Sequence, residues 1–214
     1  MSGGRSTAPA LIVFAKEPTP GRVKTRLAHV LGVDAATAAY RDLTAHTLFN
    51  CRTARDAKAI SRIELWCAPT SESTYFRELA RSGKATAYDQ PDGDLGLRMA
   101  TAIGEALTRA ERVLLIGTDC PLLDTGCLER AGMCLDTHEV VLGPAEDGGY
   151  VLVGTRIPLS FGNVRWSTRH AYADTVSAFE QMRIQWTSLP VLWDVDEPAD
   201  LARWNALRAT ASAT

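Results

Sequence analysis

Four cationic side chains lie in one short loop near the start of the chain. They are Lys16, Arg22, Lys24 and Arg26. Gly21 allows close backbone approach in the same loop, and the Thr25 hydroxyl and a helix starting nearby add hydrogen-bond donors. This grouping suits the oxygens of a diphosphate or triphosphate, the alternative being a solvated basic loop. The G-x-x-x-x-G-K-[ST] spacing of a P-loop is absent.

Acidic side chains at two distant points form a candidate metal site. Asp119 follows the apolar run 113–116, and a carboxylate at a strand end is a good Mg²⁺ or Mn²⁺ ligand, although it could instead cap a turn. Asp194 and Asp196 alternate around Val195, so an extended segment would project both the same way. We therefore expect metal ligation by Asp119 with Asp194 or Asp196, and the residues leave that last choice open.

A turn-rich segment, residues 143–150, separates two apolar runs. Gly148 and Gly149 free its backbone and place Glu146 or Asp147 at a loop tip. Either carboxylate could bind an acceptor hydroxyl or act as general base, and the alternative is a turn with solvated acids. We take Asp147, Gly148 and Gly149 as acceptor-binding candidates, with Lys24, Asp119 and Asp147 as catalytic candidates.

Two further segments carry weaker signals. Gly93 and Arg98 lie where a helix begins and could contact a nucleotide. Trp166, Ser167 and Thr168 could line the acceptor side. The alternatives are ordinary helix-start chemistry and a packed tryptophan.

The elements that must position these residues alternate between strand and helix. Apolar runs predict strands at 10–15, 63–67, 86–88, 113–117, 140–142, 150–153 and 185–192. Helical spacing predicts helices at 34–56, 71–81, 95–109, 125–135, 168–182 and 198–209. This order predicts a three-layer α/β/α fold with a mostly parallel, Rossmann-like sheet, within a single domain spanning residues 10–210.

Composition narrows the functional classes. The chain has 214 residues and a formal net charge of -2, which argues against binding to nucleic acid over a broad surface. Its five cysteines include no C-x-x-C pair, so we expect reduced packing residues. No apolar run has membrane-spanning or signal-peptide length, which predicts a cytoplasmic protein without membrane association. Residues 1–9 lack periodicity and are predicted to form a flexible tail.

Six motifs together resemble a known family. They are K-x-P-x-P-G-x-V-K-T-R-L at 16–27, G-D-L-G-x-R-M at 93–99, G-T-D-C-P at 117–121, G-P-A-x-D-G-G-Y at 143–150, W-S-T at 166–168 and D-V-D-x-P-x-D-L at 194–201. This set resembles nucleotide-diphospho-sugar transferases with the glycosyltransferase-A (GT-A) fold, some of which are arsenosugar biosynthesis glycosyltransferases. It is also similar to the molybdenum-cofactor and deazaflavin-cofactor nucleotidyltransferases. Those relatives imply an NTP at the basic loop and metal at Asp119 and at Asp194 or Asp196.

Three functions remain open at this stage. The first is metal-dependent glycosyl transfer from a nucleotide-diphospho-sugar to a small-molecule acceptor. The second couples an NTP to a phosphorylated small molecule and releases pyrophosphate, and the third is non-catalytic nucleotide binding. The basic loop favours the second, and the family resemblance favours the first. Oligomeric state is not indicated by any residue pattern.

Overall fold

The computed structural model describes residues 7–211 of the chain. Residues 1–6 of the predicted tail lie outside this range. Pro9, by contrast, is buried, and its carbonyl oxygen accepts a hydrogen bond from the Ser61 backbone N–H at 2.8 Å.

Seven strands form one sheet in the order β3-β2-β1-β4-β6-β5-β7. Their bounds are β1 Ala10–Lys16, β2 Arg62–Ala68, β3 Thr86–Asp89, β4 Val113–Ile116, β5 Val140–Pro144, β6 Tyr150–Thr155 and β7 Trp186–Ser188. Only β6 runs antiparallel to its neighbours β4 and β5, so the sheet is mostly parallel, as predicted.

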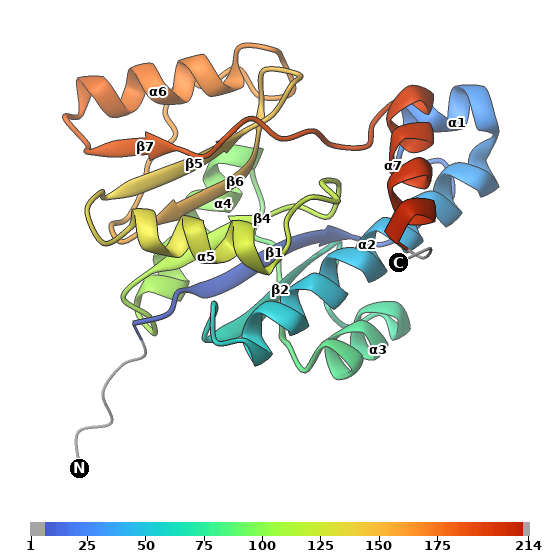
Figure 1. Cartoon of the computed structure of the whole chain (residues 1–214), viewed down its shortest axis with the longest axis horizontal. Helices are drawn as coiled ribbons and strands as arrows, with labels where there is room; N and C mark the ends of the chain where they lie inside the picture. The colour runs from blue at the N-terminus through green and yellow to red at the C-terminus, as the bar shows by residue number, and fades with distance from the viewer. Residues whose placement is uncertain (1–6, 212–214) are drawn as a thin grey trace.

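Helices cover both faces of this sheet (Figure 1). Their bounds are α1 Thr25–Leu31, α2 Val33–Asp56, α3 Thr74–Gly83, α4 Leu95–Leu107, α5 Thr125–Cys134, α6 Ala171–Gln181 and α7 Pro198–Ala211. Leu11 and Val13 of β1 pack on the face shared with α2, α3 and α5, whereas Ile12 packs on the face of α4 and α6. Because β1 is buried on both faces, its sequence is a continuous apolar run. The predicted three-layer α/β fold is confirmed.

Besides the two hydrophobic clusters on the faces of the sheet, a third cluster lies past the carboxyl ends of the strands. There α7 packs beside α1 and α2 (Figure 1). Trp204 of α7 and Leu27 of α1 are both buried in it. Trp193 and Val195 join the same cluster, so the C-terminal segment is fixed against the N-terminal helices. This cluster therefore brings together Lys24 and Asp196, which are 172 positions apart in the chain.

Several element boundaries differ from the sequence prediction. The helix expected near Thr25 was given no bounds, because the seven residues of α1 are too few to establish a helical period. Strand β7 covers only three residues of the predicted 185–192 segment. Helix α6 begins at Ala171 rather than near residue 168, because residues 166–170 form a turn and bend instead of a helix.

Two aspartates set the starts of helices that border the site. Asp94 accepts a hydrogen bond from Leu97 N at 2.8 Å and caps α4, and Asp124 accepts one from Cys127 N at 2.8 Å and caps α5. Each cap satisfies a backbone N–H that the helix itself leaves unpaired. In the described range, no helix is long and apolar enough to cross a membrane.

Candidate active site

A pocket of about 820 Å³ lies at the carboxyl ends of β1 and β4. Its charged lining comprises six cationic side chains and four carboxylates: Lys16, Arg22, Lys24, Arg26, Arg98 and Arg169, with Asp119, Asp147, Asp194 and Asp196. Parallel strands of an α/β sheet end at the same edge, which is where such folds bind ligands. The excess of cations favours an anionic ligand, and the carboxylates favour an accompanying cation.

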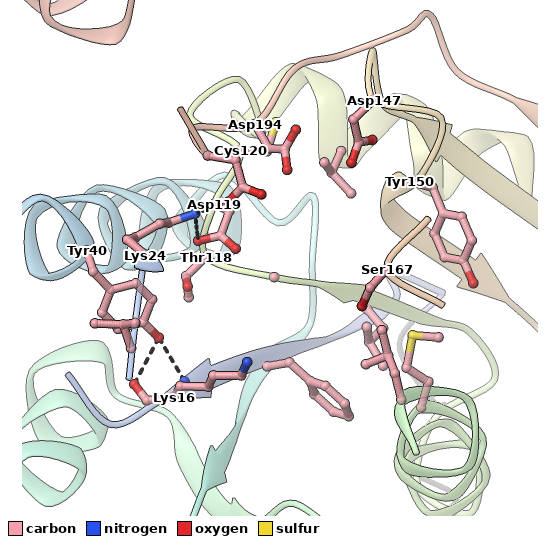
Figure 2. Close-up of a pocket in the computed structure, with 18 of the residues that line it drawn as sticks. Lys16, Lys24, Tyr40, Thr118, Asp119, Cys120, Asp147, Tyr150, Ser167 and Asp194 are labelled. Atoms are coloured by element: carbon pink, nitrogen blue, oxygen red, sulfur yellow. Dashed lines mark hydrogen bonds and ion pairs between the residues drawn. The ribbon is translucent and has the colours of Figure 1, made fainter. Parts of the chain in front are cut away.

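Lys24 is ion-paired with carboxylates from two distant segments. Its Nζ lies 2.7 Å from Asp119 Oδ1 and 3.0 Å from Asp196 Oδ1. The Lys24 side chain is only 4% exposed, whereas those of Asp119 and Asp196 are 43% and 40% exposed. Burial alone lowers the Lys24 pKa, but the charges and hydrogen bonds of the two aspartates outweigh burial and raise it, so the ammonium stays protonated. Figure 2 shows Lys24 reaching Asp119.

The backbone at Lys24 adopts a left-handed conformation, with φ 46° and ψ 48°. This region is uncommon for a residue with a side chain, and it is tolerated where surrounding contacts enforce it. Those contacts are present: α1 begins at the next residue, and Leu27 is buried in the core with α7. The conformation therefore belongs to the turn that directs Lys24 toward the acids.

One backbone hydrogen bond connects the acidic segments. Val195 N donates to Asp119 O at 2.9 Å, and the Val195 side chain is fully buried. Asp194 and Asp196, on either side of Val195, both line the pocket, in agreement with the predicted alternation.

The carboxylates of Asp194 and Asp196 have different surroundings. Both oxygens of Asp196 are engaged, one by Lys24 and the other by Arg26 Nη1 at 3.3 Å. Within the described residues, the Asp194 carboxylate has no hydrogen bond or ion pair. Burial, followed by the charges of Asp147, Asp196 and Asp119, raises the pKa of Asp194 to about 6.

The predicted metal ligands do not form a complete protein cage. Over residues 7–211, no three His, Cys, Asp or Glu side chains come together as a metal-binding group. The donor set instead fits a hard cation held by one or two carboxylates and completed by phosphate oxygens and water, as is usual for Mg²⁺. The carboxylate oxygens and the unpaired Asp194 supply suitable ligands for that arrangement.

Two pocket residues were missed by sequence reasoning because each acts through the backbone of another element. Tyr40 OH, on α2, donates to Lys16 O at 2.9 Å and accepts from Lys16 N at 2.8 Å, which fixes the end of β1 (Figure 2). Gln90 Nε2 donates to Ala15 O and to Trp66 O, and its Oε1 accepts from Arg98 Nη1 at 3.1 Å. Gln90 thus holds Arg98 at the pocket wall, a role that no local motif indicates.

The predicted acceptor residues divide into two groups. Asp147, Ser167 and Thr168 line the pocket, whereas Gly148, Gly149 and Trp166 are not part of its lining. Trp166 packs against Tyr150 and Phe161, so it supports the wall behind Ser167.

Three of the predicted glycines, Gly21, Gly93 and Gly148, have positive φ and shape turns near the pocket. Gly148 has φ +85°, and a Cβ there would lie 2.3 Å from the Arg169 carbonyl oxygen, so only glycine fits. Gly21 and Gly93 also lie outside the lining and have positive φ. Thr25 and Arg98, by contrast, line the pocket, and their contacts with phosphate or nucleotide stay predictions.

Cys120 lines the pocket but is not suited to nucleophilic chemistry. Its side chain is buried, and that burial raises the thiol pKa to about 12. The reactive thiolate is therefore scarce at neutral pH. All five cysteines are free, as predicted.

A family model described as "Uncharacterized protein conserved in bacteria (DUF2064)" matches residues 51–168, more than half of the chain. A crystal structure of a provisionally named nucleotide-diphospho-sugar transferase from Desulfovibrio desulfuricans G20 is 30% identical, with a TM-score of 0.79 over 90% of this chain and 83% of its own. This chain belongs to the DUF2064 family. No protein with a curated function matches it in sequence.

More distant structures share the fold of this DUF2064 member. CMP:2-keto-3-deoxy-manno-octonic acid synthetase, solved with CTP, is 13% identical with a TM-score of 0.59 over 95% of this chain and all of its own. The Rv0371c protein of Mycobacterium tuberculosis, solved with manganese, is 17% identical with a TM-score of 0.50 over 92% and 97% of the two chains. At these identities the likeness extends to the fold alone.

Proposed function

We propose that this protein transfers a sugar from a nucleotide-diphospho-sugar to a small-molecule acceptor. The proposal rests on one observation: Lys24 of the basic loop forms ion pairs with Asp119 and Asp196. All three residues line the pocket at the carboxyl ends of the strands. A diphosphate needs cations, and a bound divalent metal needs carboxylates; both are present within one site. The 30% identical protein from Desulfovibrio desulfuricans is provisionally named a nucleotide-diphospho-sugar transferase, which supports the proposal.

The basic loop would hold the diphosphate during transfer. Lys16 is exposed at the end of β1 and extends into the pocket (Figure 2). Arg22 and Lys24 would oppose the charge that develops on the departing nucleoside diphosphate, an electrostatic contribution to catalysis. Arg98, held by Gln90, would contact the nucleotide from the α4 side.

Asp147 would be the general base toward the acceptor. Its Oδ1 accepts a hydrogen bond from Gly149 N at 2.8 Å, and in the described part of the chain its second oxygen has no partner. In the reaction, an acceptor hydroxyl oxygen bonds to the sugar carbon, the bond from that carbon to the diphosphate oxygen breaks, and Asp147 takes the hydroxyl proton. Ser167 and Thr168 would orient the acceptor.

Asp119 and Asp194 would be the protein ligands for Mg²⁺ or Mn²⁺. Asp194 is preferred to Asp196 because both oxygens of Asp196 already have cationic partners. When bound, the metal would neutralise charge on the diphosphate. A manganese complex is known for one protein of the same fold.

Nucleotidyl transfer is the second candidate. It is favoured by the number of cations in the basic loop, because a triphosphate carries more negative charge than a sugar diphosphate. In that reaction a phosphorylated acceptor attacks the α-phosphate of an NTP, and pyrophosphate leaves. The CTP complex of one fold neighbour is consistent with this chemistry. A role in arsenosugar biosynthesis, implied by the sequence resemblance, remains a prediction.

A ligand panel followed by product analysis tests both candidates. Purified protein with Mg²⁺ or Mn²⁺ is heated with NTPs and nucleotide-diphospho-sugars, since a ligand that binds the native state raises the melting temperature. Glycosyl transfer predicts stabilisation by a nucleotide-diphospho-sugar and release of a nucleoside diphosphate. Pyrophosphate release from NTPs alone would replace it with nucleotidyl transfer, and binding without either product would leave only non-catalytic nucleotide binding.

The same assay tests the role of Asp119. Asp119→Asn is expected to lower turnover roughly 10²–10³-fold, by analogy with the loss of one electrostatic partner of a transition state. Asp92→Asn, which neutralises an exposed carboxylate outside the pocket lining, serves as the matched control and is expected to keep full turnover. Equal turnover of the two variants would rule out Asp119 as a functional ligand.

A further inference from the structure

Lys24 occupies the position between two carboxylates that a cation would otherwise take. Its Nζ lies within 3.0 Å of oxygens from Asp119, near the middle of the chain, and Asp196, near its C-terminus. The backbone bond from Val195 N to Asp119 O keeps the two acidic segments together whether or not Lys24 is present. The protein therefore carries an internal cation at its own acidic site.

An ammonium in this position opposes a divalent cation in two ways. It occupies one oxygen of each carboxylate, through a hydrogen bond to Asp196 Oδ1 and an ion pair with Asp119 Oδ1, and its positive charge repels a second cation at short range. Because Lys24 is buried, water does little to screen that repulsion. Arg26 adds a weaker, exposed positive charge at Asp196 Oδ2.

The proposal requires the Lys24 side chain to move while the backbone of the two acidic segments stays joined by the Val195 N–Asp119 O bond. Lys24 has a flexible four-carbon side chain and lies in the basic loop beside Arg22 and Arg26. A polyphosphate bound to that loop presents several charged oxygens as new acceptors for the ammonium. When Lys24 turns to the phosphate, Asp119 Oδ1 becomes available to a metal that Asp194 also contacts, and the ammonium charge moves away from the acidic site.

We propose that Lys24 is a specificity-determining residue that excludes free divalent cations from the acidic site formed by Asp119, Asp194 and Asp196 and admits a cation only together with a polyphosphate. The polyphosphate step rests on the proposed function. By thermodynamic linkage, the phosphate ligand would raise metal affinity by the same factor as the metal raises phosphate affinity. The site would thus select a metal–nucleotide complex over either component alone.

Binding of Mn²⁺ alone, followed by the electron paramagnetic resonance signal of the free ion, tests the exclusion. The wild-type protein is expected to bind Mn²⁺ weakly without nucleotide. Lys24→Met preserves the length of the side chain and removes its charge, and we expect its Mn²⁺ affinity to be about tenfold higher or more. Lys24→Arg retains the charge and is expected to bind as weakly as the wild type.

Two further variants locate the effect. Adding Asp119→Asn to Lys24→Met is expected to abolish the gain, because a ligand is lost. Arg112→Gln removes an ion pair to Asp136 at the opposite end of β4, and no change in Mn²⁺ affinity is expected. Should Lys24→Met fail to fold, Lys24→Gln replaces it. Its neutral amide also removes the positive charge, so the same rise in Mn²⁺ affinity is expected, and it still donates hydrogen bonds that help the variant to fold.

An affinity of Lys24→Met or Lys24→Gln within twofold of the wild type would overturn the proposal. So would tight nucleotide-free binding of Mn²⁺ by the wild-type protein. Neither result depends on turnover, so the proposed transfer reaction would remain standing in both cases. Conversely, failure to detect any nucleotide product would reject the proposed function without affecting the Mn²⁺ comparison.

Discussion

Two charged clusters in this protein have similar geometry and opposite sign. In the first, Glu64 of β2 is 1% exposed and lies 2.8 Å from Arg62 Nε and 2.9 Å from Arg109 Nη2. In the second, buried Lys24 lies between two half-exposed aspartates. Each cluster compensates one buried charge with two partners, as burial of an ion requires.

The surroundings of the two clusters indicate a structural role for the Glu64 cluster and a functional role for the Lys24 cluster. None of the Glu64 cluster lines the pocket, and Arg109 is further held over the Tyr88 ring. The Lys24 cluster lies in the pocket, depends on a left-handed backbone, and adjoins Asp194 with its raised pKa. Strained backbone and perturbed carboxylates are typical of functional sites, whereas a fully compensated buried charge is typical of a scaffold.

The largest predicted effect removes both cations of the structural cluster. Arg62→Gln with Arg109→Gln leaves the Glu64 carboxylate buried without an ionic partner, and we expect unfolding free energy to fall by about 3–5 kcal/mol. Chemical denaturation measures this loss. Adding Glu64→Gln is expected to restore most of it, since no buried charge remains. A loss below about 1 kcal/mol in the double variant would contradict the comparison.

The second prediction is a smaller change in unfolding free energy, this time a gain, on removal of the Asp194 charge. Its folded-state pKa is raised from 3.8 to about 6, so its contribution to stability is present below pH 4 and is lost as pH rises through 6. Asp194→Asn should therefore melt at a higher temperature than the wild type at pH 8 and at nearly the same temperature at pH 4. Because Asp194 is partly exposed, we expect a gain near 1 kcal/mol, or roughly 2–4 °C.

This measurement is made by thermal unfolding without divalent metal, so that the carboxylate is unligated. Asp92→Asn is the control, because it neutralises an exposed carboxylate outside the pocket lining. A stability gain of Asp194→Asn at pH 4 as large as at pH 8 would show that charge is not its cause.

The smallest predicted effect concerns the outer cation of the functional cluster. Arg26 is 62% exposed and lies 3.3 Å from Asp196 Oδ2, so water and salt weaken this pair. Arg26→Gln is expected to change the unfolding free energy by less than about 0.5 kcal/mol. A loss comparable to that of the double arginine variant would mean that the functional cluster also stabilises the fold.

Much of this molecule was predictable from local patterns. The continuous apolar run of β1 and the run before Asp119 identified two central strands, and the loops after them contained the charged residues of the pocket. The helix expected near Thr25 was given no bounds because α1 is short, and the predicted glycines proved to shape loops rather than line the pocket. The fold prediction held, and so did the predicted similarity to nucleotide-diphospho-sugar transferases, since both rested on motifs spread over the whole chain. The similarity to arsenosugar and molybdenum-cofactor enzymes stays a prediction.

The sequence by itself determined the strand and helix order, the basic loop and the acids at the strand ends, because hydrophobic periodicity and residue chemistry are local properties. Only the tertiary structure decided that Lys24 lies between Asp119 and Asp196, that Asp194 is left unpaired, and that Gln90 holds Arg98. These relations depend on packing of α7 against α1 and α2, which joins segments about 170 residues apart. Burial and charge proximity arise only from that packing, and they determine which cation each carboxylate meets.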